Sequence, residues 1–188
     1  MMKPCTGRLP MAEATLTHDA VGRNGDSSDL LFLDVDGVLH PVGADYSFSS
    51  RFFSHLPRLE ALLREFDSVD VVISSDWRRA ESIEQLQRYF SADIQHRIIG
   101  ATPQIDPSVG VSNRRQLEIQ AWLDGNGRSD AEWVALDDWA SNFEVGFARL
   151  VLTDPARAFD QDSFQELRSH FLRFAVDRRF IATSTHMK

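Results

Sequence analysis

The sequence predicts an α/β fold with three layers, in which a central parallel sheet lies between helices on both of its faces. Short apolar segments, several of them rich in β-branched residues, alternate with longer segments in which apolar residues recur at helical spacing. Each apolar segment ends in turn-forming or acidic residues, as the buried strands of a parallel sheet do. Because helices join such strands through right-handed crossovers, the alternation predicts one Rossmann-like sheet.

One folded domain accounts for the length and composition of the chain. Its 188 residues are 43% hydrophobic and 26% charged, which is typical of a globular protein. Residues 1–28 show no periodic apolar pattern and many small polar residues, so we expect a poorly ordered lead-in before a domain at 29–188. Met1 and Met11 are both compatible with this division as the start of translation.

Net charge, cysteine content and hydropathy limit the function and the location. The net charge of −8 argues against broad, non-specific binding to nucleic-acid backbones, although it leaves room for a local basic groove. The single cysteine, Cys5, cannot form an internal disulfide, which fits a reducing compartment. No apolar segment reaches the ~20 residues that cross a bilayer, so we expect a cytoplasmic protein without a membrane partner.

The first predicted strand, at 30–33, carries the strongest indication of chemistry. Its four apolar residues run directly into Asp34, Asp36 and Gly37. Open α/β sheets bind ligands at the carboxyl ends of their strands, so the two acids would lie side by side at the mouth of a crevice. Such close carboxylates repel each other unless a cation or a shared proton compensates. The alternative is a solvated acidic turn in which Gly37 supplies a positive φ.

The next segments predict a lid, a helix and a second strand. Residues 41–50 are too irregular for a helix, and we expect a loop or hairpin over the strand end. Apolar residues at helical spacing predict a helix over 54–66 with Ser54 as its N-cap. The β-branched segment 69–74 predicts a buried strand that leads into a polar turn at Ser75.

A helix, a strand and a second helix follow. The first helix is capped by Ser82 and ends near Ser91, and a short strand is predicted at 97–100. Ser112 is the predicted N-cap of the second helix. We expect Gly125 to end that helix at a left-handed position.

Two arginines begin the helix that Ser112 is predicted to cap. Arg114 and Arg115 lie in its first turn, where basic residues oppose the helix dipole at a cost of roughly a few tenths of a kcal/mol. Their placement therefore indicates a role other than helix stability. The alternative, which applies more to Arg114, is an exposed side chain without a function.

A second pair of acids, Asp137 and Asp138, follows the strand predicted at 133–136. One such pair alone is usually turn chemistry, but a pair at the carboxyl end of a second strand would converge on the first. A strand at 150–153 and an amphipathic helix close the chain. The apolar residues of that helix are Phe164, Leu167, Phe171 and Phe174.

Converging carboxylates form a hard oxygen site. Such a site suits Mg²⁺ better than zinc, for which the necessary His and Cys ligands are missing. Asp34 and Asp137 are the predicted side-chain ligands, and the backbone carbonyl of Asp36 is the predicted third.

The order of these motifs resembles that of the haloacid dehalogenase (HAD)-like hydrolases. The matching motifs are, in order, the segment 34–39, Ser75 after a strand, a basic residue and the pair Asp137-Asp138. Together they span about residues 29–155. The resemblance implies a Rossmann-like core in which Asp137 coordinates Mg²⁺ and Asp138 supports it directly or through a water molecule.

A narrower resemblance involves the segments 73–78 and 115–123, which are similar to the small HAD domain of Swiss Army knife RNA repair proteins. The superfamily resemblance implies a phosphatase in which Asp34 attacks phosphorus and forms an aspartyl-phosphate. Asp36 would act as general acid and then as general base. Dehalogenases of the superfamily lack this second acid, which favours phosphoryl transfer.

The same resemblance assigns two residues to the phosphoryl group. Ser75 matches the hydroxyl that hydrogen-bonds a phosphoryl oxygen, with Ser74 as the alternative. Arg115 matches the cation that neutralises the nucleophile and the developing charge, with Arg114 as the alternative.

The places where the superfamily inserts cap domains, here about 42–53 and 102–111, are too short for a folded cap. We therefore expect an open site, which suits a large phosphorylated substrate such as a nucleic-acid end or a phosphoprotein, or cover from an oligomer partner. The alternative function is a catalytically silent phosphate- or nucleic-acid-binding partner in a repair or stress assembly. No P-loop pattern is present, which excludes a fused kinase.

Overall fold

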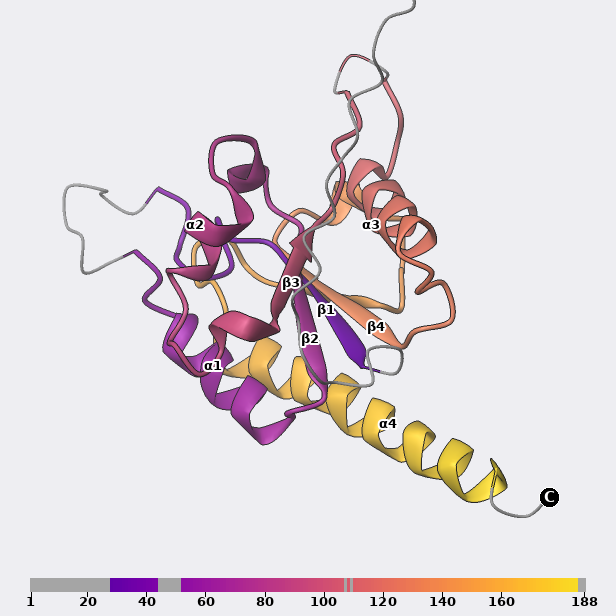
Figure 1. The fold of residues 1–188 in the computed structure, drawn as a ribbon. Helices are drawn as coiled ribbons and strands as arrows, with labels where there is room; N and C mark the ends of the chain where they lie inside the picture. Colours follow the sequence, from indigo (N-terminus) through magenta and orange to yellow (C-terminus); the bar gives the residue numbers. More distant parts are fainter. Residues whose placement is uncertain (1–27, 44–51, 107, 109, 186–188) are drawn as a thin grey trace, which may run out of the picture.

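Five parallel strands form a sheet in the order β3-β2-β1-β4-β5, with β1 at its centre (Figure 1). The computed structural model describes residues 28–43, 52–106, 108 and 110–185. The strands are β1 (Asp29–Leu33), β2 (Val69–Ile73), β3 (Ile98–Ala101), β4 (Trp133–Asp137) and β5 (Leu150–Leu152).

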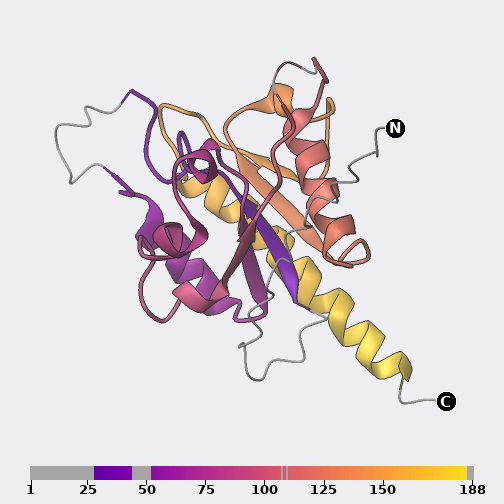
Figure 2. The ribbon, with the colours of Figure 1, turned by 45° about the horizontal axis from the view of Figure 1, so that its top comes forward.

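Helices cover both faces of this sheet. α1 and α4 lie against each other on one face, and α3 covers the other (Figures 1 and 2). The helices are α1 (Leu56–Glu65), α2 (Ile83–Gln87), α3 (Arg114–Gly125) and α4 (Gln161–Thr185). The three-layer α/β class predicted from the sequence is therefore confirmed.

Strand β1 packs into two apolar clusters because successive side chains of a strand point to opposite faces of the sheet. Leu31 and Leu33 belong to the cluster that includes α1 and α4, whereas Leu30 and Phe32 belong to the cluster that includes α3. All four side chains are completely buried. The central strand is thus fixed from both sides, and so is the position of the residue that follows it.

The register of the three central strands decides what meets at the sheet edge. Leu33 of β1 is paired with Ile73 of β2 and with Leu136 of β4. Since the strands are parallel, the residues after these pairs emerge at the same edge and at the same level. Asp34 and Asp137 therefore come side by side although about a hundred residues of chain separate them.

The predicted N-cap of α2 is confirmed, whereas that of α1 is wrong. Ser82 caps α2 as predicted: its hydroxyl accepts a hydrogen bond from the Gln85 N–H, and the Gln85 side chain accepts one from the Ser82 N–H. The N-cap of α1 is His55, so the prediction of Ser54 was wrong. The reason is that Phe53 has a φ of 54°, which keeps the chain out of the helical conformation up to that point.

Both predicted ends of α3 were wrong. Its N-cap is Asn113, in a left-handed conformation with φ 55°, rather than Ser112. Asparagine tolerates this conformation better than most residues. At the other end, Gly125 still belongs to the helix, and Asn126 caps it with an N–H bound to a carbonyl one turn earlier. The left-handed glycine is Gly127, with φ 64°.

Some predictions fall on residues outside the described ranges. They concern the lead-in at 1–28, of which only Ser28 is described, and the lid at 41–50, of which residues 44–50 lie outside. Within the described part of the chain, no helix combines the length and the apolar character that a membrane-crossing helix requires.

Candidate active site

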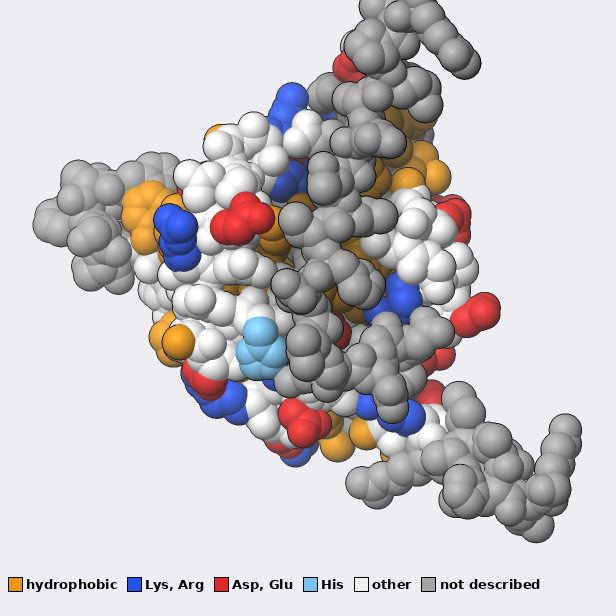
Figure 3. All heavy atoms as spheres, in the orientation of Figure 1, with side chains coloured by type: hydrophobic (Ala, Val, Ile, Leu, Met, Phe, Trp, Pro, Cys, Tyr) orange, Lys and Arg blue, Asp and Glu red, His pale blue; other side chains and the backbone are white. Residues whose placement is uncertain are grey.

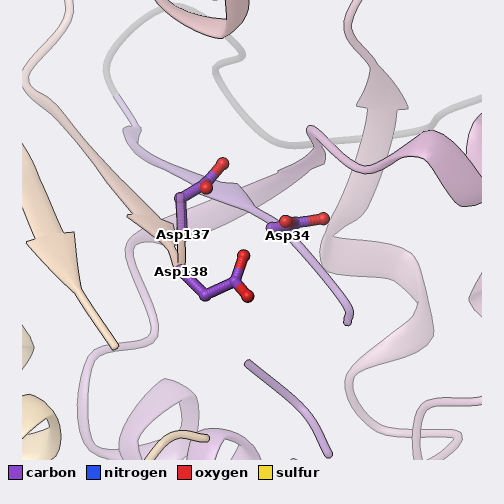
Figure 4. A group of neighbouring side chains, drawn as sticks. All are labelled: Asp34, Asp137 and Asp138. Carbon is purple, nitrogen blue, oxygen red and sulfur yellow. The ribbon is translucent and has the colours of Figure 1, made fainter. Parts of the chain in front are cut away.

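Three carboxylates converge at the carboxyl edge of the sheet, from the ends of β1 and β4 (Figure 4). One side-chain oxygen from each of Asp34, Asp137 and Asp138 lies within 4.8 Å of the other two. Asp34 and Asp137 are buried, and Asp138 is partly exposed. Backbone groups fix the buried pair: the Val35 N–H donates to Asp34 Oδ1 and the Trp139 N–H donates to Asp137 Oδ1, each at 2.8 Å.

Burial and mutual repulsion oppose ionisation of this carboxylate cluster, by which we mean Asp34, Asp137 and Asp138. Loss of solvent raises the pKa of Asp34, and the neighbouring charge of Arg115 opposes that rise. Loss of solvent also raises the pKa of Asp137, and the charge of Asp34 raises it further. The nearest compensating group is the Arg115 guanidinium, whose Nε lies 3.6 Å from Asp137 Oδ2.

The cluster fits a divalent cation in charge and in donor type. Three carboxylates face one guanidinium, so full ionisation leaves an excess negative charge that a cation would offset. All the donors are oxygens, which is the ligand set that Mg²⁺ prefers. The predicted contribution of Asp36 to this site, through its backbone carbonyl, stays a prediction.

Gly37 makes room for the cluster. It adopts a φ of 68°, and a Cβ atom at this position would lie 2.1 Å from Oδ2 of Asp138. The Gly37 carbonyl accepts a hydrogen bond from the buried Thr153 hydroxyl at 2.8 Å, which anchors the turn. A glycine is therefore needed here twice, for its left-handed backbone and for its missing side chain.

Asp36 lies beside the cluster with its carboxylate held by other residues. His40 Nε2 lies 3.0 Å from Asp36 Oδ1, and Trp77 Nε1 donates to Asp36 Oδ2 at 2.9 Å. The hydrogen bond from His40 lowers the pKa of Asp36, burial opposes this, and the hydrogen bond from Trp77 lowers it further. Neither of these contacts with Asp36 was predicted from the sequence.

Both candidate serines lie at the end of β2. Ser75 is buried, and a hydrogen bond from its side chain lowers the pKa of Asp34 against the effect of burial. The Ser74 carbonyl accepts a hydrogen bond from Arg115, while its buried hydroxyl has no hydrogen-bond partner among the described residues. Ser75 is thus the serine in contact with the predicted nucleophile.

The arginines of this edge divide into two roles. Arg115 is buried and contacts the carboxylate cluster, whereas Arg114 is only partly buried. Arg78, the residue after Trp77, forms a buried ion pair with Glu118 at 2.6 Å. Arg78 also donates to the Ser75 carbonyl, so it supports the turn that carries the serine.

Comparison with known proteins adds one finding. A family model described as the HAD domain in Swiss Army Knife RNA repair proteins matches residues 30–164, a range that includes every residue of the carboxylate cluster and its neighbours. The match confirms the family resemblance seen in the motifs. Neither the curated proteins nor the solved structures contain a significant match.

Proposed function

From the membership of this chain in the family of HAD domains in Swiss Army Knife RNA repair proteins, we propose that it is a Mg²⁺-dependent phosphomonoesterase with Asp34 as its nucleophile. Family membership supports a HAD-like hydrolase or phosphatase. The observation that carries the finer proposal is the convergence of Asp34, Asp137 and Asp138 within 4.8 Å.

In the first step, Asp34 attacks phosphorus through a carboxylate oxygen, and the bond between phosphorus and the leaving oxygen breaks. Asp36 gives its proton to that oxygen, so the leaving group departs as an alcohol. Arg115 and Ser75 flank the phosphoryl group as cation and hydrogen-bond donor. Mg²⁺, held by the carboxylate cluster and the carbonyl of Asp36, would supply the positive charge that lets an anionic phosphate approach these acids.

In the second step, a water molecule attacks the phosphorus of the aspartyl-phosphate. Asp36 takes a proton from that water as the bond between phosphorus and Asp34 breaks, which releases inorganic phosphate and restores both carboxyl groups. The lowered pKa of Asp36 favours the carboxylate, the form that accepts a proton in this second step, and leaves a smaller protonated fraction for the first step.

Several features support a phosphorylated nucleic-acid end as substrate, with a phosphoprotein as the alternative. Residues 102–106 between β3 and α3 form no strand or helix that would cover the site. Trp139, the residue after the acid pair, is 64% exposed and offers an apolar surface on which a base can stack. On the face seen in Figure 3, the described acidic and basic side chains are interspersed, so recognition would rest on the phosphorylated end rather than on a long backbone.

The test is phosphate release from 3′- and 5′-phosphorylated oligonucleotides, phosphorylated metabolites and a phosphopeptide, with Mg²⁺ and with EDTA. Wild type is expected to require Mg²⁺, and Asp34→Asn is expected to lose activity by about a hundredfold or more. The matched control is Asp154→Asn, because Asp154 is an exposed acid after β5 whose carboxylate bonds a local N–H. Undiminished activity in Asp34→Asn would reject the role of Asp34 as nucleophile. If wild type releases phosphate from none of these substrates, the alternative function as a binding protein would be favoured.

A further inference from the structure

Both oxygens of the Asp36 carboxylate are held by side chains that sequence reasoning did not assign to it. His40 Nε2 contacts Oδ1 at 3.0 Å, and since a carboxylate only accepts, Nε2 carries the hydrogen. The indole N–H of Trp77 donates to Oδ2 at 2.9 Å. We call this pair of contacts from His40 and Trp77 to Asp36 the clamp. One donor comes from the turn after β1 and the other from the turn after β2, so the clamp joins two loops of the site.

The two donors are themselves immobilised. The His40 side chain is 1% exposed. Its ring lies 5.2 Å from that of Phe52, 5.7 Å from that of Phe53 and 6.0 Å from that of Trp77. Phe53 and Trp77 pack edge to face at 5.4 Å. Rotation of either donor would require the aromatic rings around it to move.

The clamp leaves Asp36 accessible. The Asp36 side chain is 45% exposed, although His40 is buried and Trp77 is partly buried. A carboxylate oxygen has two lone pairs, so each oxygen keeps one for a proton of water or of a leaving group. The arrangement fixes the acid and leaves its working side open to solvent.

We propose that His40 and Trp77 are positioning residues that hold the Asp36 carboxylate in the orientation needed for proton transfer to and from the oxygens at phosphorus. The inference rests on the proposed function, because it assigns Asp36 the acid and base roles. If the Asp36 side chain rotated freely about χ1, only some of its rotamers would reach the leaving oxygen. Holding a catalytic group in the productive orientation is a large part of the rate gain in intramolecular reactions.

Leaving-group dependence separates positioning of an acid from general damage. An aryl phosphate such as p-nitrophenyl phosphate leaves without a proton, whereas an alkyl phosphate such as glycerol phosphate needs one. The second-order constant kcat/KM reports formation of the aspartyl-phosphate. Trp77→Phe removes only the donor and keeps an aromatic ring, and it is expected to lower kcat/KM about tenfold or more for the alkyl phosphate but less than about threefold for the aryl phosphate.

His40→Phe is expected to show the same selective loss, and His40→Gln, which keeps a side-chain donor, is expected to recover part of it. Asp36→Asn defines the full effect. The matched control is Tyr89→Phe, because the Tyr89 hydroxyl bonds Glu81 and not Asp36, and the variant keeps the ring that packs on Phe53 and Trp77. An equal loss for both substrates in Trp77→Phe, or no loss, would overturn the positioning role.

A measurement without turnover distinguishes failure of the clamp from failure of the proposed function. The indole N–H proton of Trp77, assigned among the four tryptophans by its absence in Trp77→Phe, is expected to move upfield in Asp36→Asn. An unmoved resonance would refute the clamp while leaving the Asp34-dependent activity intact. If Asp34→Asn instead hydrolyses both phosphates as well as wild type does, the proposed function fails and takes the positioning role with it, even where the resonance moves.

Discussion

Replacement of Gly37 by alanine tests the carboxylate cluster most directly. The residue has a φ of 68°, and a non-glycine residue in this conformation costs about 1 to 2 kcal/mol. The added Cβ would also lie 2.1 Å from Oδ2 and 2.5 Å from Cγ of Asp138, closer than any real contact. Because the backbone turn is anchored at Thr153, Asp138 has to give way: its carboxylate rotates away from Asp34 and Asp137, and its Cβ, which would lie 2.9 Å from the added atom, has to shift as well.

Thermal unfolding of Gly37→Ala in EDTA and in saturating MgCl₂ measures both effects. The backbone strain alone predicts a fall in Tm of about 2 to 8 °C for a chain of this size. The displaced carboxylate predicts that the increase in Tm caused by Mg²⁺ falls to less than about half of the wild-type increase.

The matched control is Gly127→Ala. Gly127 has nearly the same φ, 64°, but an added Cβ there meets no atom within 4 Å. This variant is expected to lose a similar amount of stability and to keep the full Mg²⁺ response. A wild-type Mg²⁺ response in Gly37→Ala would show that Asp138 does not contribute to a metal site, and the reasoning from the cluster would be refuted.

Three further predictions follow from the same geometry. Burial raises the pKa values of Asp34 and Asp137, so the folded protein keeps protons that the unfolded chain has lost. Without Mg²⁺, the free energy of unfolding therefore falls as pH rises above the ordinary carboxyl range. The increase in Tm on adding Mg²⁺ is expected to be larger at about pH 8 than at about pH 5. Glu118→Leu removes the buried carboxylate that faces Arg78 and leaves Asp76, at 3.9 Å, as the remaining charge partner of that arginine. The free energy of unfolding in urea is expected to fall by about 3 to 5 kcal/mol, part of which Arg78→Met in the same chain restores. Trp139→Ala raises KM for a phosphorylated oligonucleotide about tenfold and leaves KM for glycerol phosphate unchanged, since only the former stacks a base.

The strands and the convergence of the acids were predictable because both follow from the pattern of apolar residues along the chain and from the common direction of the strands. Apolar segments such as 30–33 and 133–136 that alternate with helices are typical of the strands of a parallel sheet, and a parallel sheet brings all its carboxyl ends to one edge. Asp34 and Asp137 needed no knowledge of side-chain packing to be placed together. The order of motifs then identified the family that the comparison confirmed.

The hydrogen-bond partners of the site side chains could not be predicted, because they depend on the conformation of loops, which show no periodic sequence pattern. Asp36 and Trp77 are 41 residues apart, and their contact requires the turn after β2 to fold back over the turn after β1. The same holds for Arg78 and Glu118, which are 40 residues apart. Only the spacing of Asp36 and His40, four residues across a glycine turn, offered a local indication of their contact.

Burial is graded across the site, and the gradient indicates how a substrate approaches. Asp34, the proposed nucleophile, is 7% exposed and Asp137 is 1% exposed, whereas the side chain of Asp36 is 45% exposed and Trp139 is 64% exposed. In the proposed function, a phosphoryl group that reaches these two buried acids passes the exposed side of Asp36, so its leaving group points toward solvent. Discrimination between substrates consequently falls to the rim of the site, where Trp139 is the large exposed side chain nearest in sequence to the carboxylates.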